Sequence, residues 1–243
     1  MVPEGALEPL ARFEEIKIPL IEPVHGLEAV SGVLGVPEWW PTGARVSVVL
    51  AHGASGSKDD PLLVALQQAL TERKVLTLRF NFPFAEAEKS KPDPMPVLER
   101  TLRHAIATLG RDPTAAPAHL FIGGRGLGGR VAANLATSQV RSDGLFFLGF
   151  PLHPPGRPAE LRVDRLFRIV SPMLFVQGTR DRSCEIPVLR KTLVRVGAPT
   201  TLHVIDEADQ SFRVPRKTGR TAADVHREIL TVLDAWIERV LGG

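Results

Sequence analysis

Short runs of β-branched residues alternate along this chain with segments whose apolar residues recur at helical spacing. The clearest run, residues 45–51 (RVSVVLA), ends at a turn, and the next segment, residues 61–73, carries leucine at positions 62, 63, 66 and 70. Strands and helices that alternate in this way build a mostly parallel sheet with helices on both faces. The sequence therefore predicts an α/β fold around one central sheet.

Two alternating apolar segments, residues 13–20 and 27–34, precede this part and are predicted to pair as a hairpin. The later strands are predicted over residues 45–51, 75–80, 119–122, 145–150, 172–177 and 201–205, and the helices over residues 61–73, 96–109, 127–137, 187–196 and 221–241. We expect residues 1–9 to form an N-terminal tail and residues 10–243 a single domain. The Pro- and Arg-rich segment 152–170 is too short for a domain and is predicted to be a minimal lid.

The composition excludes several classes of protein. Hydrophobic residues make up 44% of the 243 residues and charged residues 23%, which is typical of a globular chain. Cys184 is the only cysteine, so a disulfide framework and a multi-cysteine zinc site are excluded. The net charge of +3 is small for this length and does not argue for nucleic-acid binding. Without a signal-peptide pattern or an 18-residue apolar run, we expect a cytoplasmic protein that does not enter a membrane.

A cluster of glycines follows the strand predicted at residues 119–122, and the segment 123–130 reads GGRGLGGR. Three interpretations compete. Gly124, Gly126 and Gly129 satisfy the dinucleotide-binding pattern G-x-G-x-x-G, although that pattern belongs at the first strand-to-helix turn. The cluster could instead be a tight turn with no further role.

The third interpretation is a nucleophile elbow that lacks its nucleophile. The elbow pattern is G-x-S-x-G between a strand and a helix, and here it reads Gly124-Arg125-Gly126-Leu127-Gly128. The central residue of an elbow has a strained positive φ, which glycine adopts at little cost. Glycine at position 126 would therefore remove the hydroxyl group and relieve the strain together.

With these segments in view, the chain resembles the α/β-hydrolase fold, and within it the hydrolase-like family of testis-expressed protein 30 and KAT8 regulatory NSL complex subunit 3. The resemblance covers roughly residues 45–240. It rests on the order of several segments: residues 51–54 (AHGA), 79–84 (RFNFPF), 92–93, 96–99, the glycine cluster, 149–156 (GFPLHPPG), 172–181 (PMLFVQGTRD) and 208–212 (ADQSF). It implies an α/β-hydrolase fold with a mostly parallel sheet, helices on both faces and a minimal lid.

The resemblance also implies a triad in the order Ser, Asp, His. The nucleophile position falls on Gly126, the acid position on Asp181 and the histidine position on Gln210. The oxyanion hole would be formed by the backbone N–H groups of Ala54 and Leu127. Since acyl transfer needs a nucleophile and a base, we predict a degenerate, catalytically inactive protein that acts as a ligand-binding, scaffold or regulatory module. The alternative is a weak or atypical serine-type hydrolase of small esters or dienelactone-like substrates.

Other residues near the predicted strand ends are candidates for a role in the pocket. His52 is expected to line the pocket and to shape the oxyanion loop, and Ser55 in the same loop is a possible stand-in nucleophile. His153 is expected near the pocket mouth, where it could replace the missing base. We predict no cofactor and no metal site, because the acidic residues at positions 206, 207 and 209 have no spaced histidine partners.

A basic run, formed by Arg213, Arg216, Lys217 and Arg220, lies between the last predicted strand and the last helix. Arg180 and Arg182 fall close to it in the predicted topology, so the run could form a positive rim over the pocket. The partners expected from this charge are a small-molecule ligand or an acidic protein. No aromatic residue interleaves the run, which argues against stacking on nucleic acid.

Overall fold

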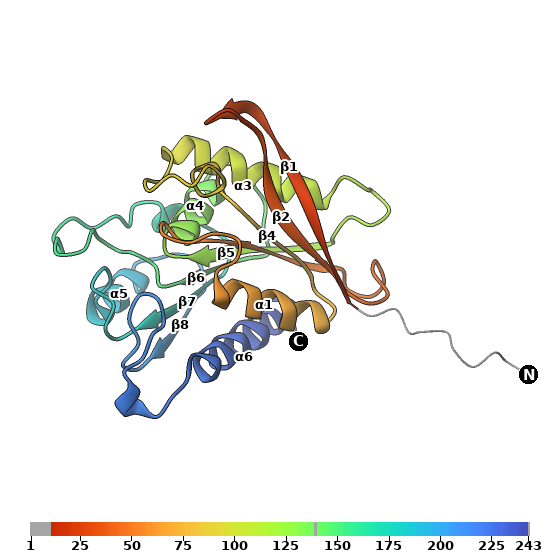
Figure 1. The fold of residues 1–243 in the computed structure, drawn as a ribbon. Helices are drawn as coiled ribbons and strands as arrows, with labels where there is room; N and C mark the ends of the chain where they lie inside the picture. Colours follow the sequence, from red (N-terminus) through yellow and green to blue (C-terminus); the bar gives the residue numbers. More distant parts are fainter. Residues whose placement is uncertain (1–10, 139, 243) are drawn as a thin grey trace, which may run out of the picture.

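The computed structural model describes residues 11–138 and 140–242, and it contains an eight-stranded sheet with the strand order β1-β2-β4-β3-β5-β6-β7-β8 (Figure 1). The strands are β1 (Arg12–Val24), β2 (Leu27–Val36), β3 (Val46–Ala51), β4 (Leu76–Phe80), β5 (His119–Arg125), β6 (Gly144–Leu148), β7 (Met173–Gly178) and β8 (Thr200–Ile205). Strand β2 pairs antiparallel with β1 and β4, and the pairs from β4 to β8 are parallel. The predicted mostly parallel sheet is confirmed.

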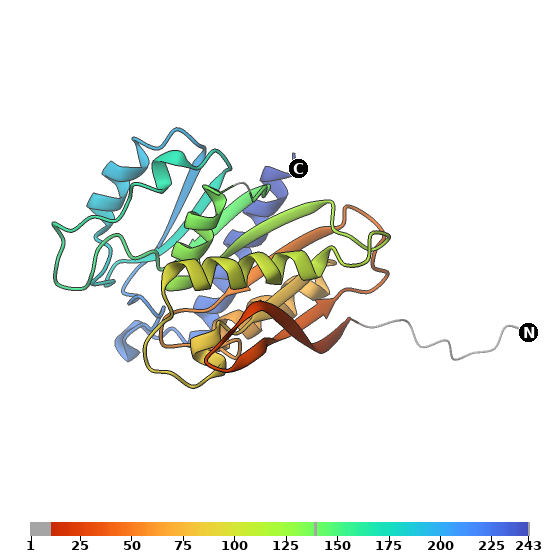
Figure 2. The ribbon, with the colours of Figure 1, turned by 90° about the horizontal axis from the view of Figure 1, so that it is seen from above.

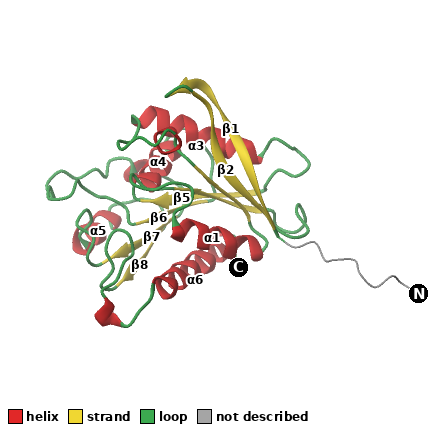
Figure 3. Cartoon of the chain, in the orientation of Figure 1, coloured by secondary structure: helices red, strands yellow, loops and turns green. Residues whose placement is uncertain are grey.

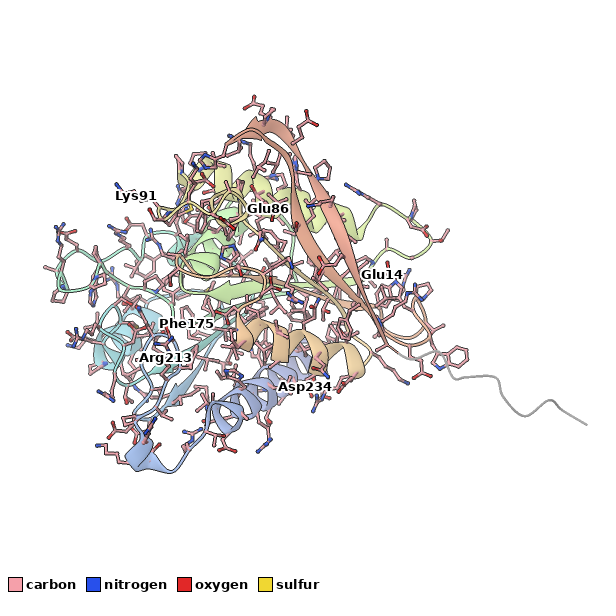
Figure 4. The ribbon with its side chains drawn as sticks, viewed as in Figure 1. Glu14, Glu86, Lys91, Phe175, Arg213 and Asp234 are labelled. Carbon is pink, nitrogen blue, oxygen red and sulfur yellow. The ribbon has the colours of Figure 1, made fainter. Side chains whose placement is uncertain are left out.

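Helices cover both faces of the sheet, as Figures 1 and 2 show. They are α1 (Pro61–Glu72), α2 (Pro83–Glu86), α3 (Met95–Leu109), α4 (Leu127–Ala136), α5 (Ile186–Leu193) and α6 (Ala222–Val240). Helices α1 and α6 pack on one face and α3, α4 and α5 on the other. Strand β3 shows how the sequence feeds both cores, because Val48 and Leu50 face α1 while Val49 faces the opposite core. Phe175 of β7, labelled in Figure 4, is fully buried in the same core as Val49.

The long connections gather at the carboxyl ends of the parallel strands, on the left in Figures 1 and 3. The segment between β6 and β7 holds a single turn of 3-10 helix, Leu166–Arg168, so the lid is minimal as predicted. Ligand sites of open parallel sheets lie at this end.

The structure departs from the predicted elements in a few places. Strand β5 continues through Gly123 and Gly124 into Arg125, whereas the sequence prediction ends the strand at residue 122. A side chain at position 123 would collide with Phe146 on the neighbouring strand β6, so glycine there permits close strand packing rather than a turn. The four-residue helix α2 was not predicted. The predicted tail, residues 1–9, lies outside the described residues.

Within residues 11–138 and 140–242, no helix combines the length and the apolar character that crossing a lipid bilayer requires.

Candidate active site at the strand ends

Gly126 stands between β5 and α4 in the conformation of an elbow. Its φ is 46° and its ψ is −105°, and its N–H donates a hydrogen bond of 3.0 Å to the Leu148 carbonyl. A Cβ at position 124 or 128 would lie closer than 3.0 Å to the carbonyl oxygen of Ala51, so both flanking glycines let β5 and α4 approach β3. A positive φ between two packing glycines favours the elbow interpretation over a tight turn with no further role.

A Cβ at position 126 would be free of steric conflict. It would contact only the carbonyl oxygen of Gly149, at 3.9 Å. The backbone leaves room for a side chain at this position and directs that side chain toward solvent-accessible space. The missing nucleophile therefore does not result from crowding at the elbow.

A cavity of about 250 Å³ lies against the elbow. It brings together four of the predicted site positions: Gly126, Leu127, Ala54 and Gln210. Gln210 packs beside the elbow through its backbone, because a Cβ on Gly149 would come within 2.8 Å of the Gln210 carbonyl oxygen. The N–H groups of Ala54 and Leu127 have no hydrogen-bond acceptor among the described residues.

Asp181 is in the same region but does not line this cavity. Its side chain is only 5% exposed, and its carboxylate accepts hydrogen bonds from the Ser183 N–H (2.7 Å), the Ser183 hydroxyl (2.7 Å) and the Gln177 amide (2.5 Å). The Asp181 loop contacts the Gln210 loop through the backbone, since the Arg180 N–H donates to the Ala208 carbonyl at 2.8 Å. No hydrogen bond joins Asp181 to Gln210 in the described structure. The structure thus brings positions 126 and 210 into one cavity that Asp181 does not line.

Comparison with known proteins agrees with this geometry. A family model described as alpha/beta hydrolase domain matches residues 44–238. The chain belongs to the alpha/beta hydrolase domain family. This assignment confirms the predicted fold, and the elbow falls inside the matched region.

Solved structures of alpha/beta hydrolases share the fold over nearly the whole chain. Dienelactone hydrolase from Anabaena variabilis is 17% identical, with a TM-score of 0.71, and the match covers 95% of this chain and 99% of that one. A serine hydrolase without a lid from Xanthomonas campestris is 19% identical, with a TM-score of 0.70 and coverage of 94% and 97%. Est1E from Butyrivibrio proteoclasticus with ferulic acid bound is 14% identical, with a TM-score of 0.73 and coverage of 94% and 100%. At these identities the likeness is one of fold.

His52 of this alpha/beta hydrolase does not line the cavity, contrary to the sequence prediction. Its side chain is fully buried, and both of its ring nitrogens are hydrogen-bonded. The Nδ1–H donates to the Gly53 carbonyl (2.8 Å), and Nε2 accepts from the Phe82 N–H (3.0 Å). Burial lowers the pKa of His52 from 6.5 to about 4, so the ring is neutral near pH 7. With both nitrogens occupied, the ring ties the loop after β3 to the loop after β4.

His153 and Ser55 line the cavity. His153 is 3% exposed, and its Nδ1–H donates to the Pro154 carbonyl at 2.9 Å. Its Nε2 is buried and has no hydrogen-bond partner in the described part of the chain. A buried polar atom without a partner is costly, so this nitrogen marks a place where a ligand atom would be stabilising.

Several lining residues were missed by the sequence reasoning. They are three arginines and two serines: Arg125, Arg130, Arg162, Ser183 and Ser211. Arg130 carried a usable signal, because it lies one helical turn after Gly126 and the same helix face must approach the elbow. Arg162 carried none, since it comes from the irregular segment between β6 and β7.

Neither Cys184 nor a group of three further arginines lines the elbow cavity. Burial raises the pKa of the Cys184 thiol, which is the opposite of what a reactive cysteine needs. Arg180, Arg182 and Arg213 line a neighbouring cavity of about 490 Å³ that shares Gln210 with the elbow cavity; Arg213 is labelled in Figure 4. Among the described residues, no group of three or more His, Cys, Asp or Glu side chains could hold a metal ion.

Proposed function

We propose that this alpha/beta hydrolase family member binds a small molecule at the elbow cavity without cleaving it, and acts as a ligand-binding, scaffold or regulatory module. The observation that carries the proposal is Gly126, which holds the central elbow position and has no atom that could attack a carbonyl. Gln210 adds to it, because an amide is not a useful base near pH 7.

The loss of chemistry leaves the binding features of the site in place. The Ala54 and Leu127 N–H groups remain available for a ligand oxygen, and the cavity beside them remains open to a small molecule. Oxyanion-hole donors and binding alone retain only about 10³–10⁴-fold catalysis over water in a serine hydrolase without its triad. Such a residual rate is far below that of a working esterase.

The order of segments such as GFPLHPPG and PMLFVQGTRD supports a closer kinship with the hydrolase-like family of testis-expressed protein 30 and KAT8 regulatory NSL complex subunit 3. From the sequence we also propose a cytoplasmic location. The arginines of the neighbouring cavity suit an acidic protein partner as well as a small ligand.

A second candidate function is a weak or atypical serine hydrolase of small esters or dienelactone-like substrates. One observation favours it: Ser55, Ser183 and Ser211 line the same cavity as His153, whose Nε2 has no hydrogen-bond partner in the described part of the chain. Against it, no serine hydroxyl hydrogen-bonds a histidine ring in the described residues, and the Ser183 hydroxyl already donates to Asp181.

Turnover of a panel of short-chain nitrophenyl esters separates the two candidates. We expect the full chain to be no faster than its Gly126→Ala variant, because neither protein carries a nucleophile at the elbow. Turnover by the full chain that is lost in His153→Ala, and in one of Ser55→Ala, Ser183→Ala or Ser211→Ala, would establish the atypical hydrolase instead.

A further inference from the structure

The elbow cavity has an unbalanced set of charged side chains. Arg125, Arg130 and Arg162 line it, and no aspartate or glutamate does. Arg125 is neutralised by an ion pair with the buried Asp60. Arg130 and Arg162 have no side-chain hydrogen bond or ion pair within residues 11–138 and 140–242. The cavity therefore carries two uncompensated positive charges.

These two charges act on each other. Burial and the positive charge of Arg162 lower the pKa of Arg130 below its ordinary value. Two like charges that share a partly desolvated cavity repel each other, and an anion between them would convert the repulsion into two attractions. The arrangement is costly for the empty protein and favourable for a complex with an anion.

Two backbone N–H groups in the cavity add to this preference. The ten-residue helix α4 points its N-terminus at the cavity, where the Leu127 N–H has no acceptor among the described residues. Such helix ends favour negative charge. The Ala54 N–H also has no acceptor among the described residues. The unpartnered Nε2 of the buried His153 is an acceptor, because Nδ1–H already donates to Pro154, so it suits a donor group of the ligand rather than its oxyanion group. Donors and positive charges from three separate loops thus surround the position that a nucleophile would occupy.

We propose that the elbow cavity is a binding site for a small organic anion whose oxyanion group, a carboxylate or a phosphate, is held by Arg130, Arg162 and the N–H groups of Leu127 and Ala54. The cavity volume of about 250 Å³ restricts the ligand to a small molecule. This inference rests on the proposed function, in which the site holds a ligand without cleaving it, and it names the chemical class of that ligand.

The test is isothermal titration calorimetry with three probes: benzoate, its neutral isostere benzamide, and inorganic phosphate. We expect benzoate or phosphate to bind the full chain, and benzamide to bind at least about tenfold more weakly than the bound anion, because charge-assisted hydrogen bonds are stronger than neutral ones. The ratio of benzoate to phosphate affinity identifies which oxyanion the cavity prefers.

Substitutions of single arginines show where the anion binds. Arg130→Met and Arg162→Met are each expected to weaken binding of the preferred anion about tenfold, the size of a lost charge-assisted hydrogen bond. The matched control is Arg190→Met, which removes an exposed arginine of α5 that lines neither cavity and is expected to change the affinity less than twofold. Since Arg162 is exposed, its variant keeps the test valid even where Arg130→Met fails to fold.

Three results would overturn the inference: no binding of either anion, equal binding of benzoate and benzamide, or a larger loss in Arg190→Met than in the two cavity variants. Benzamide binding that equals benzoate binding would leave the proposed function standing, because a ligand site without charge preference would remain. Failure of the proposed function is recognised separately, by ester turnover that depends on a cavity serine and His153.

Discussion

The two sides of the elbow cavity differ in what constrains them. On the strand side, Gly124 and Gly128 press against Ala51, and His52 joins two loops with both ring nitrogens. On the side where the triad would act, Gly126 has space for a side chain and Gln210 is exposed with no side-chain hydrogen bond in the described structure. The difference shows that packing dictates which residues stand on the strand side, whereas packing does not dictate which side chains stand at positions 126 and 210.

Asp181 belongs to the framework of the site, although the resemblance predicts that it holds the position of the catalytic acid. Three hydrogen bonds from Ser183 and Gln177 occupy its buried carboxylate. Its place in the protein is explained by the structure of its own loop. An aspartate at the acid position is therefore weak support for a working triad here.

The largest effect should come from adding one methyl group on the strand side. We expect Gly124→Ala to destabilise the protein by more than about 4 kcal/mol, because its Cβ would overlap backbone atoms of the buried strand β3, which cannot move aside. Gly126→Ala is the matched control and should cost about 1–3 kcal/mol, the price of a positive φ alone. Urea unfolding measures both, and equal losses at the two positions would break the comparison.

A second effect concerns pH and the buried His52. Its folded pKa of about 4 lies below the value of 6.5, so its contribution to stability is fully present above pH 6.5 and is lost as the pH falls toward 4. The pKa difference corresponds to about 3 kcal/mol. Unfolding free energies measured from pH 7 to pH 4 should fall less steeply in His52→Asn than in the unaltered protein.

His104→Asn, on helix α3, provides the matched control for this pH series, since it removes a histidine whose ring hydrogen-bonds the Pro19 carbonyl and neither of the two loops that His52 joins. Its slope between pH 7 and pH 4 should equal that of the unaltered protein. A flattened slope in His104→Asn, together with an unchanged slope in His52→Asn, would contradict the account of His52.

The smallest effects separate the acid position from the histidine position. Asp181→Asn should cost about 1–3 kcal/mol, because an amide presents a donor where the carboxylate accepts three hydrogen bonds. Gln210→Ala should change stability by less than about 0.5 kcal/mol, as expected for an exposed side chain. Thermal unfolding of the two variants checks this, and a costly Gln210→Ala would show that the histidine position also serves the framework.

Most of the framework could be predicted from the sequence, because strand β3 is a continuous apolar run and helix α6 has apolar residues at helical spacing. The elbow could also be located, since few structures need glycine at positions 124, 126 and 128 together. The short helix α2 and the extension of β5 were missed: four residues carry no periodicity, and a glycine pair in a strand resembles a turn.

The chemistry of the site was less predictable than its position. The orientation of Asp181 toward Ser183 and the burial of His52 depend on side-chain partners that only the folded loops bring together. Arg162 reaches the cavity from an irregular segment, where spacing along the chain says nothing about direction. The positively charged lining of the cavity therefore became visible only with the structure.

The account is tested most directly by fluorophosphonate labelling, followed by mass spectrometry, of the unaltered chain and of the double variant Gly126→Ser with Gln210→His. The central claim is that the framework of the elbow is intact and only its reactive groups are missing. The predicted result is no adduct on the unaltered chain and an adduct at position 126 of the double variant. An adduct on the unaltered chain, or a folded double variant that stays unlabelled, would contradict the account.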